Sequence, residues 1–297
     1  MTGFQSQPSK IALIVGATGM AGQAFSLYLR QHNYQTVGIS RKGSEITADF
    51  SSKPEVIQSI INKVRPTLIV NCAAIVSISD CNDHPREATN VNSLLPMYLA
   101  DAAEKSSSRL IHISTDHFYT GDGDRPHDEG HPVTLVNKYA ETKYKGELYA
   151  SRYNNCLIVR TNITGFRGDP VRPTYAEWLI DALIHKKPLT LFTDFYTSTI
   201  DVRSLCRLSM HARLDSFSGI LNIASAVPVS KMRFAFYMAR SLGIDLDWCK
   251  YGSVTSLALD RAESAGLDCS KAERLTGESM PLPLKVTKML AEERTLS

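Results

Sequence analysis

Long apolar runs, secretion signals and clusters of basic residues are all missing from this 297-residue chain. No apolar stretch reaches the roughly 18 residues that a membrane-spanning helix needs, and the N-terminal MTGFQSQPS lacks the basic start and apolar segment of a signal peptide. The net charge is only +3, and lysine and arginine form no run, which argues against nucleic acid as the main partner. We therefore expect a cytoplasmic protein with no membrane and no nucleic-acid partner.

Cysteine is also sparse, and its spacing follows no known framework. The six cysteines contain no C-x-x-C pair, which is typical of reduced thiols in a cytosolic protein. The apolar fraction of 43% and the charged fraction of 21% are ordinary globular values, so neither disorder nor a fibrous repeat is indicated. A chain of this length forms one large α/β domain or two closely packed ones.

Short apolar strands alternate with helical patterns through the first half of the chain. Strands are predicted at residues 10–15, 36–40, 67–71, 109–114 and 156–160, with helices at 19–32, 53–64, 85–105 and from residue 139 to about 153. This alternation predicts an α/β fold with a Rossmann-type doubly wound parallel sheet. After residue 161 it loosens, with helices at 175–185, 202–214 and 231–242 and strands at 189–192 and 219–224.

Three regions follow from this pattern. Residues 1–9 are predicted to be a flexible tail, and residues 10–160 a dinucleotide-binding Rossmann domain. Residues 161–297 are predicted to be mainly a smaller C-terminal substrate-binding region, interleaved with the sheet.

A glycine-rich loop separates the first strand from the first helix. Gly16, Gly19 and Gly22 permit a tight turn and a close backbone approach, while the helix N-terminus attracts a pyrophosphate. The alternative is a glycine-rich turn without a ligand. Where an NAD-preferring enzyme usually has an acidic residue, the second strand ends in Ser40 and Arg41. A guanidinium matches a 2′-phosphate, so NADPH is the predicted cofactor, with a solvated basic turn as the alternative.

One tyrosine is placed for proton transfer. Of the twelve tyrosines only Tyr139 has a lysine four residues later, and in a helix Lys143 shares its face. An ammonium beside a phenol is expected to lower the phenol's pKa, although chance alone supplies about one such pair in a chain like this. Ser114 and Thr115 lie at the C-terminal end of the fourth strand, where a hydroxyl can hold a substrate carbonyl beside Tyr139. Together with the glycine loop, these residues indicate hydride transfer.

With these motifs the chain resembles an extended short-chain dehydrogenase/reductase, and within that superfamily the dTDP-4-dehydrorhamnose reductases. The matching stretches cover most of the first 165 residues in family order and are patchier afterwards. They are GATGMAG, ADFSSKPEVIQSIINKVRPTLIVNCAA, ATNVNS, RLIHISTD, GDGDRPHDE, NKYAETKYKGE, IVRTN and LDCSKAERLTG.

The resemblance implies roles for individual residues. Tyr139 is the implied general acid, Lys143 its partner and a contact of the nicotinamide ribose, and Thr115 the residue that hydrogen-bonds the substrate oxygen. Asn92 is also implied to support the core near the site. The implied cofactor-binding residues are Gly16, Thr18, Gly19, Met20, Gly22, Ser40, Arg41, Asp49, Phe50, Cys72, Ala73, Ala74, Asn92, Tyr139 and Lys143. The implied substrate-binding residues are Ser114, Thr115, His117, Asn162 and Ile163.

The chain also departs from the family pattern, mostly at positions that would face the sugar. His117 replaces the usual tyrosine after Ser-Thr-Asp, and Asn162 and Ile163 stand where an aromatic residue is expected. Other departures are the segment Ile78 to Asn82, Leu135 and Ala140. The substrate therefore need not be dTDP-4-dehydrorhamnose. Because His117 takes the place of the second carboxylate of related dehydratases, ketone reduction is favoured over dehydration.

Two further sets of residues have competing interpretations. His127 and His131 lie in HDEGH, which lacks the helical H-E-x-x-H context of a zinc site, so a solvated turn is predicted and no metal. Arg160 and Arg172 either meet a substrate pyrophosphate or form structural ion pairs.

The function implied by the resemblance is NADPH-dependent reduction of a keto group on a nucleotide-linked deoxysugar, which is then the small-molecule partner. Two other functions stay open. One is a non-catalytic NADP-binding regulatory subunit, like the β subunit of methionine adenosyltransferase. The other is an epimerase or a non-sugar carbonyl reductase of the same fold. The base, the sugar, the product stereochemistry and the oligomeric state also stay open, with a homodimer as one option.

Overall fold

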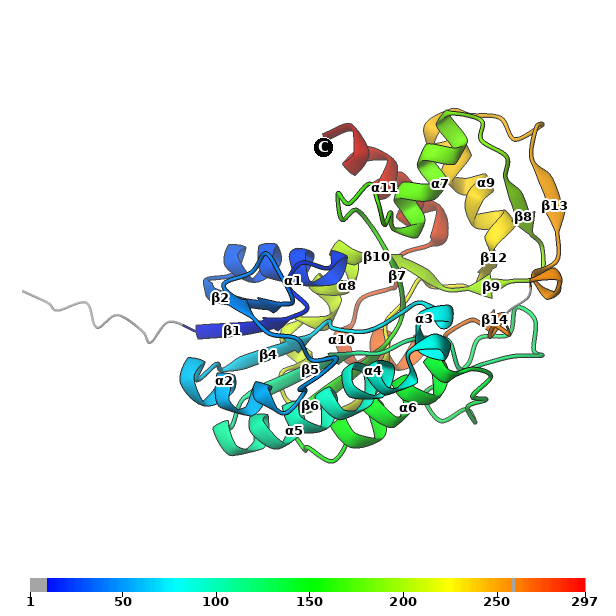
Figure 1. The fold of residues 1–297 in the computed structure, drawn as a ribbon. Helices are drawn as coiled ribbons and strands as arrows, with labels where there is room; N and C mark the ends of the chain where they lie inside the picture. Colours follow the sequence, from blue (N-terminus) through cyan, green and yellow to red (C-terminus); the bar gives the residue numbers. More distant parts are fainter. Residues whose placement is uncertain (1–9, 258–259, 297) are drawn as a thin grey trace, which may run out of the picture.

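A computed structural model describes residues 10–257 and 260–296 of the chain, so the predicted tail at residues 1–9 lies outside the described residues (Figure 1). A seven-stranded parallel sheet runs through the molecule in the order β11-β6-β5-β4-β1-β2-β3. Its strands are β1 (Lys10–Val15), β2 (Tyr34–Ser40), β3 (Ile46–Thr47), β4 (Leu68–Asn71), β5 (Arg109–Ile113), β6 (Cys156–Arg160) and β11 (Gly219–Asn222). The predicted α/β fold with a Rossmann-type parallel sheet is confirmed. The strand order reverses beside β1, where ligands bind in such sheets.

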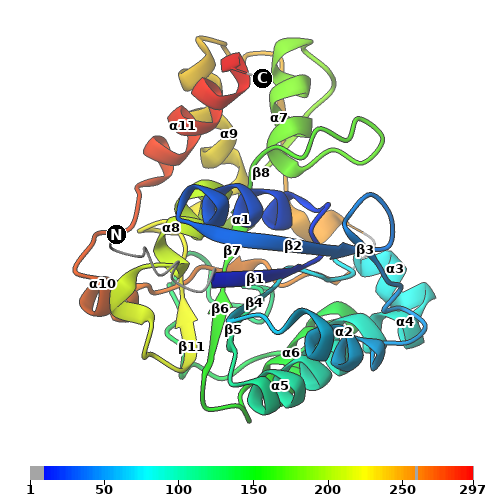
Figure 2. The ribbon, with the colours of Figure 1, turned by 90° about the vertical axis from the view of Figure 1, so that its left-hand side faces the viewer.

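Helices cover both faces of the sheet because its strands are apolar on both sides. In β1, Ala12 and Ile14 face one core while Leu13 and Val15 face the other. The first face is covered by α1 (Met20–Gln31) and α8 (Val202–Ser209), and the second by α2 (Val56–Val64), α5 (Leu95–Ser106) and α6 (Lys138–Ala150), as Figure 2 shows.

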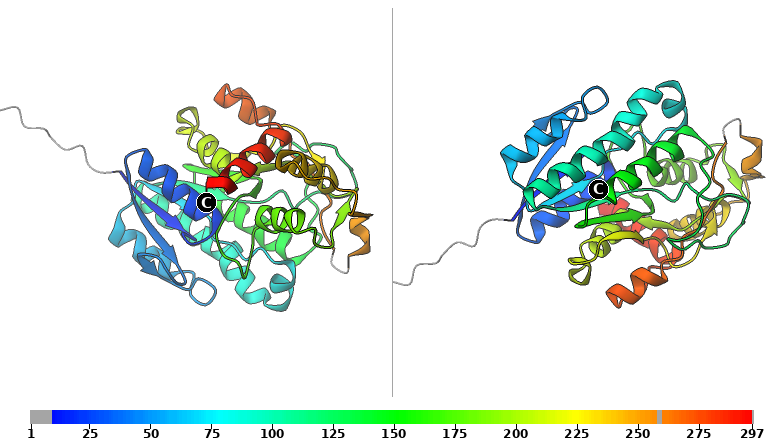
Figure 3. Two further views of the ribbon diagram at one scale, coloured as in Figure 1. Left: turned by 90° about the horizontal axis from the view of Figure 1, so that it is seen from above. Right: turned by 90° about the horizontal axis from the view of Figure 1, so that it is seen from below.

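Much of the second half forms a smaller unit beside the carboxyl ends of the strands (Figure 3). Helices α7 (Tyr175–Ile184), α9 (Lys231–Leu242) and α11 (Pro283–Leu296) enclose a third core that includes Leu179, Phe234 and Leu290. Its short strands pair as β7 (Asn162–Thr164) with β10 (Thr199–Asp201), β8 (Thr190–Phe192) with β13 (Lys250–Gly252), and β9 (Tyr196–Thr197) with both β12 (Val229–Ser230) and β14 (Ser264–Ala265). Because α8 and β11 belong to the Rossmann layers, the two halves of the chain are interleaved.

The predicted helix at residues 85–105 is divided in the structure. It consists of α4 (Pro85–Thr89), a π-helical turn η1 (Asn90–Leu94) and α5, and is preceded by α3 (Ile78–Asp83). The π turn packs so closely on α6 that a Cβ on Gly146 would lie 2.1 Å from the carbonyl oxygen of Asn92. Short helices complete the fold: α10 (Ser270–Thr276) and 3₁₀ turns at Ala212–Leu214 and Val254–Ser256. Among the described residues, every helix is too short or too polar to cross a membrane.

Candidate active site

The glycine loop between β1 and α1 needs glycine at two positions for steric reasons. Gly16 has a φ of +84°, and a Cβ there would lie 2.8 Å from the amide nitrogen of Ala73. A Cβ on Gly22 would lie 2.2 Å from the carbonyl oxygen of Gly16. Helix α1 begins at Met20, and Gly19 before it offers no side-chain cap. The first turn of α1 therefore presents its backbone N–H groups and the positive end of its dipole, which suits an anion.

A cleft of about 740 Å³ lies beside this loop. Most of the predicted cofactor residues line it: Gly16, Thr18, Gly19, Ser40, Arg41, Asp49, Phe50, Cys72, Ala73 and Ala74. Residues that sequence reasoning did not assign to the cofactor, Arg167, Asp169 and Arg172, also line it. The cleft has the size of a cofactor site and joins the end of β2 to the loop after β7.

The cleft is basic where β2 ends. Arg41 is exposed there, and the Ser40 hydroxyl donates to the carbonyl oxygen of Lys42 at 2.6 Å, which fixes the turn. Across the cleft, Arg172 forms an ion pair with Asp169 at 3.0 Å. Arg172 therefore lies at the cofactor cleft and forms an ion pair there.

Helix α6 brings Tyr139 to a second, smaller pocket. Asn137 caps the helix by accepting a hydrogen bond from the Ala140 amide at 2.9 Å. The pocket has a volume of about 200 Å³ and is lined by Val76, Ser77, Ile78, Ser79, His117, Tyr139 and Arg261. The segment Ile78 to Asn82, where the chain departs from its family, therefore supplies a wall of the pocket that holds Tyr139.

Thr115 lies beside Tyr139, as expected for the residues predicted to transfer a proton, but the pKa of Tyr139 shifts in the direction opposite to the prediction. Burial raises the pKa of Tyr139 above its usual value, while a hydrogen bond from Thr115 lowers it and the charge of Asp116 raises it further. This direction is opposite to the predicted lowering by Lys143. Burial is the largest cause, and Lys143 is not among the groups that shift this pKa; its ammonium donates to the carbonyl oxygen of Ile113 at 2.8 Å. Burial lowers the pKa of Lys143 to about 8, although Glu147 and Cys72 raise it.

His117 is buried beside Tyr139, with 5.7 Å between the ring centres. Its Nε2 atom lies 3.0 Å from the Asn137 amide nitrogen and 3.3 Å from the backbone nitrogen of Ala262, both of which are donors. Burial and the nearby Arg261 lower the pKa of His117 to about 4, so the ring is neutral at physiological pH. His117 therefore joins the start of α6 to the segment around residue 262.

Some predicted site residues are engaged elsewhere. The Ser114 hydroxyl donates to Glu147 at 2.5 Å inside the core, and its expected contact with the substrate stays a prediction. The Asn92 side chain bonds to both backbone groups of Ile75 at 2.9 Å, so it supports the segment after β4 and does not line the cleft. Asn162 donates to Asp116 at 2.8 Å, and Ile163 packs against the core under the sheet.

Sequence reasoning missed a buried charge pair next to Thr115. Burial raises the pKa of Asp116 well above its usual value, and the charge of Lys231 and a hydrogen bond from Asn162 oppose the shift. Burial lowers the pKa of Lys231, and Asp116 raises it. Lys231 begins α9, more than a hundred residues away in sequence, and its ammonium lies 4.5 Å from the ring centre of Tyr175. No local pattern marks this pairing.

Comparison with known proteins gives the family. A family model described as the RmlD substrate binding domain matches residues 10–294. The chain belongs to this family. It is 25% identical to a dTDP-4-dehydrorhamnose reductase of Salmonella typhimurium over 297 residues, covering 94% of this chain and 97% of the relative. It is 26% identical over 281 residues to a probable low-salt glycan biosynthesis reductase of Haloferax volcanii, covering 91% and 93%.

Solved structures agree on the fold. A dTDP-4-dehydrorhamnose reductase from Bacillus anthracis, in complex with NADP, matches with a TM-score of 0.84 at 21% identity, covering 97% of this chain and all of that one. A UDP-glucose 4-epimerase from Thermotoga maritima matches with a TM-score of 0.79 at 17% identity. The resemblance to dTDP-4-dehydrorhamnose reductases that the motifs predicted is therefore confirmed.

Proposed function

We propose that this protein is an NADPH-dependent reductase of a keto group on a nucleotide-linked deoxysugar. The observation that carries the proposal is that Thr115 lies close enough to Tyr139 for its hydroxyl to lower the pKa of the phenol against the effect of burial, while Tyr139 lines the smaller pocket with His117. A carbonyl oxygen placed between these hydroxyls would accept from both, and Tyr139 would supply the proton that completes the alcohol.

The cleft fits a dinucleotide. The close approach of Gly22 to Gly16 leaves no side chain between the loop and a pyrophosphate, and the first turn of α1 supplies donors for it. Arg41 at the end of β2 would pair with a 2′-phosphate. NADPH bound there would supply the hydride. Dinucleotide complexes of similar folds, including the reductase from Bacillus anthracis with NADP, support this assignment.

Lys143 would act on the cofactor side of Tyr139. Its ammonium is buried and already partnered by the Ile113 carbonyl, so it is held in one position along α6. A charged lysine close to the phenol would stabilise the developing phenolate, while burial alone disfavours that charge. Its lowered pKa, about 8, keeps it mostly protonated at neutral pH.

The substrate class follows from the relatives and from the pocket. Relatives along nearly the whole chain act, by name, on dTDP-4-dehydrorhamnose or in glycan biosynthesis. The pocket around Tyr139 is polar, with Ser77, Ser79 and His117 in its wall and Arg261 at its rim. Hydroxyl and imidazole groups of this kind suit a sugar. We propose His117 as a wall of the sugar pocket.

The test is turnover of a nucleotide 4-keto-6-deoxyhexose, followed by the loss of NADPH absorbance. Tyr139→Phe should reduce kcat by about 100-fold or more, since a positioned general acid is worth that much, while the Kd for NADPH stays unchanged. Tyr144→Phe on the same helix is the matched control, because Tyr144 packs edge-on against Phe118 away from the pocket. Full activity of Tyr139→Phe would refute the proposal.

Stoichiometry separates the reductase from an epimerase of the same fold. A reductase consumes one NADPH for each product, whereas an epimerase returns its cofactor unchanged. Absence of turnover across a panel of nucleotide keto-sugars, together with a stable complex with a larger enzyme, would favour the regulatory-subunit alternative.

A further inference from the structure

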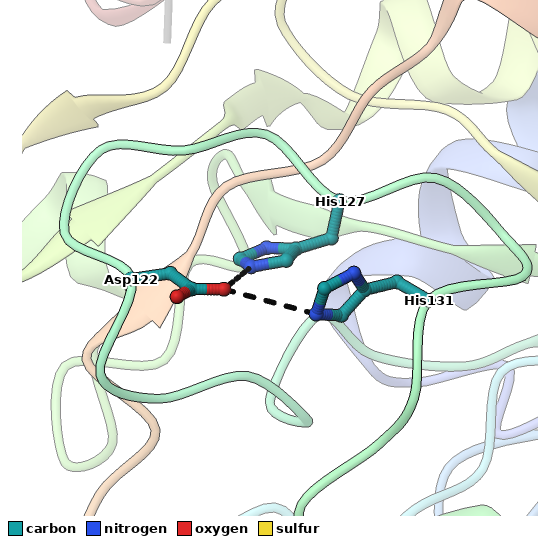
Figure 4. Close-up of side chains that lie close together, drawn as sticks. All are labelled: Asp122, His127 and His131. Atoms are coloured by element: carbon teal, nitrogen blue, oxygen red, sulfur yellow. Dashed lines mark hydrogen bonds and ion pairs between the residues drawn. The ribbon is translucent and has the colours of Figure 1, made fainter.

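Three possible metal ligands converge in the loop that joins β5 to α6. Asp122, His127 and His131 each offer one ligand atom, and these atoms all lie within 4.8 Å of one another. Figure 4 shows the Nε2 atoms of both rings directed at the same carboxylate. The Asp122 oxygen lies 3.1 Å from Nε2 of His127 and 3.7 Å from Nε2 of His131. This differs from the predicted solvated turn, because the His127 side chain is buried.

The contacts of His127 leave its Nε2 atom facing the Asp122 carboxylate. Its Nδ1 atom lies 2.9 Å from the carbonyl oxygen of Gly266, which can only accept, so Nδ1 carries a hydrogen. In the neutral ring Nε2 then bears a lone pair, and that lone pair faces an acidic oxygen at 3.1 Å. A cation between these two atoms would be bound by the lone pairs of both.

A metal ion accounts for more of this arrangement than a hydrogen bond does. A hydrogen bond accounts only for the shorter contact at His127, because the 3.7 Å separation at His131 is too long for one. An ion uses the lone pairs of both rings and the carboxylate together. We propose that Asp122, His127 and His131 bind a divalent transition-metal ion of the zinc class, with a fourth position open to water.

The donor set and spacing favour zinc over magnesium or calcium. Two imidazoles and one carboxylate suit zinc, whereas magnesium and calcium prefer oxygen ligands. Zinc–ligand distances of about 2.0–2.2 Å in tetrahedral geometry place neighbouring donor atoms about 3.3–3.6 Å apart. The distances from the Asp122 oxygen to the two histidines, 3.1 and 3.7 Å, bracket this range.

Contacts with the C-terminal segment hold the ligand residues in place before a metal binds. The backbone nitrogen of Asp122 donates to the Ser264 hydroxyl at 3.1 Å, and that of His127 donates to Gly266 at 3.0 Å. The ring of Tyr119 stacks on His127 with 4.2 Å between centres. The bond from Nδ1 of His127 to a backbone carbonyl is the outer contact that orients metal-binding histidines. Arg125 lies 3.8 Å from the same Asp122 oxygen, but its exposed side chain can move away.

Metal titration of the purified full-length protein tests this proposal. After chelator treatment, calorimetry should show one zinc bound per chain and no comparable heat with magnesium. Cobalt should give the intense visible bands of a tetrahedral or five-coordinate site. His131→Gln and Asp122→Asn should each weaken zinc binding by about 100-fold or more, since each removes one of three ligands.

A matched control is available at the C-terminal end of α7. His185 lies 2.9 Å from Asp181 in an exposed pair whose carboxylate is shared with Lys187, so it repeats the histidine–carboxylate contact at a surface site. His185→Gln should bind zinc like the unmodified protein. Circular dichroism of each metal-free variant checks that the protein folds. The side chains of Asp122 and His131 are partly exposed, so we expect their substitution to leave the fold intact. Unchanged zinc binding in either ligand variant, or none in the unmodified protein, would overturn the proposal.

Discussion

In the interior of the protein, Arg160 binds the carboxylate of Glu147 through two of its guanidinium nitrogens. Its Nε atom donates to both carboxylate oxygens at 3.1 Å, and its Nη2 atom donates to one of them at 2.7 Å. Both side chains are at most 3% exposed. The alternative that Arg160 meets a substrate pyrophosphate is therefore wrong, and the residue is a structural part of the core beneath the site.

Removing one member of this pair should lower the stability of the folded protein. Glu147→Gln is expected to lower the free energy of unfolding by about 3–5 kcal/mol, because it leaves the Arg160 guanidinium buried without its counter-charge. The double variant with Arg160→Met should recover much of this loss. Urea unfolding of the single and double variants measures both effects.

Glu141→Gln on the same helix is the control for the Glu147 experiment. Glu141 pairs with Lys138 and Lys145 at the surface, where such contacts contribute about 1 kcal/mol or less. If Glu141→Gln and Glu147→Gln lowered the free energy of unfolding equally, the buried pair would contribute no more to stability than the surface pairs.

The features that sequence predicted well are local. The first strand, the glycine loop and the first helix follow from residues that are adjacent in the chain, and the strand at residues 10–15 has the predicted ends. The grouping of Thr115 with Tyr139 rests on its place at the C-terminal end of the fourth strand and on the family resemblance, and Thr115 lies close enough to influence the pKa of Tyr139.

The features that sequence missed depend on contacts between distant segments. Asp116 meets the charge of Lys231 only because α9 folds over the end of the sheet. His127 is buried only because its loop pairs with the segment at Leu267, so a turn that looks solvated in sequence is enclosed in the fold. The predicted effect of Lys143 on Tyr139 also depended on where its ammonium points, which helical spacing does not determine.

Gly22→Ala should disrupt the cofactor loop. The new Cβ would lie 2.2 Å from the Gly16 carbonyl oxygen and 2.7 Å from the Cα of Ala17, and both are backbone atoms that cannot move independently. We expect NADPH affinity to fall by at least about 10-fold, with a loss of about 1–3 kcal/mol in unfolding free energy from overpacking. Fluorescence titration and urea unfolding measure these changes.

Gly130→Ala is the control for the glycine prediction. Its Cβ would meet nothing closer than the Asp128 carboxylate oxygen at 3.5 Å, so the protein should tolerate it. If Gly22→Ala binds NADPH as well as Gly130→Ala does, the loop does not approach the pyrophosphate in the proposed way.

Arg41→Asp should change cofactor preference. The substitution removes the exposed guanidinium at the end of β2 and puts an acid where a ribose diol would be bound. A charge-assisted hydrogen bond contributes about 1.5–3 kcal/mol, so the ratio of NADPH to NADH affinity should fall by about 10- to 100-fold. Arg152→Asp is the charge-matched control, because Arg152 lies over Tyr149 on the surface. The same ratio in both variants would place the 2′-phosphate elsewhere.

Alkaline pH should destabilise the protein through five thiols, of which four are buried and Cys72 is partly buried beside the cleft. Burial raises the pKa of each from 9.0: to about 11 for Cys81, to about 12 for Cys72, Cys156 and Cys269, and well above 9.0 for Cys206. Above pH 9 the unfolded thiols lose protons that the folded ones keep, so stability falls as pH rises. Lys143 and Lys231 act in the opposite direction, because burial lowers their pKa values and the folded state loses those protons first. The five thiols outnumber the two lysines, and the net stability should decline between pH 9 and 11.

Cys156→Ala isolates the contribution of one thiol to this decline. Each fully shifted group changes the unfolding free energy by about 1.4 kcal/mol per pH unit, so removing Cys156 should make the alkaline slope shallower by about 1 kcal/mol per unit. Urea unfolding at several pH values, under reducing conditions, gives the slope independently of any change in stability at pH 7. Cys249→Ala should change the slope less, since that thiol is only partly buried and its pKa is less perturbed. An unchanged slope in Cys156→Ala would mean that the β6 thiol ionises in the folded protein as readily as in the unfolded chain, which its enclosure between β5 and the helices on that face of the sheet argues against.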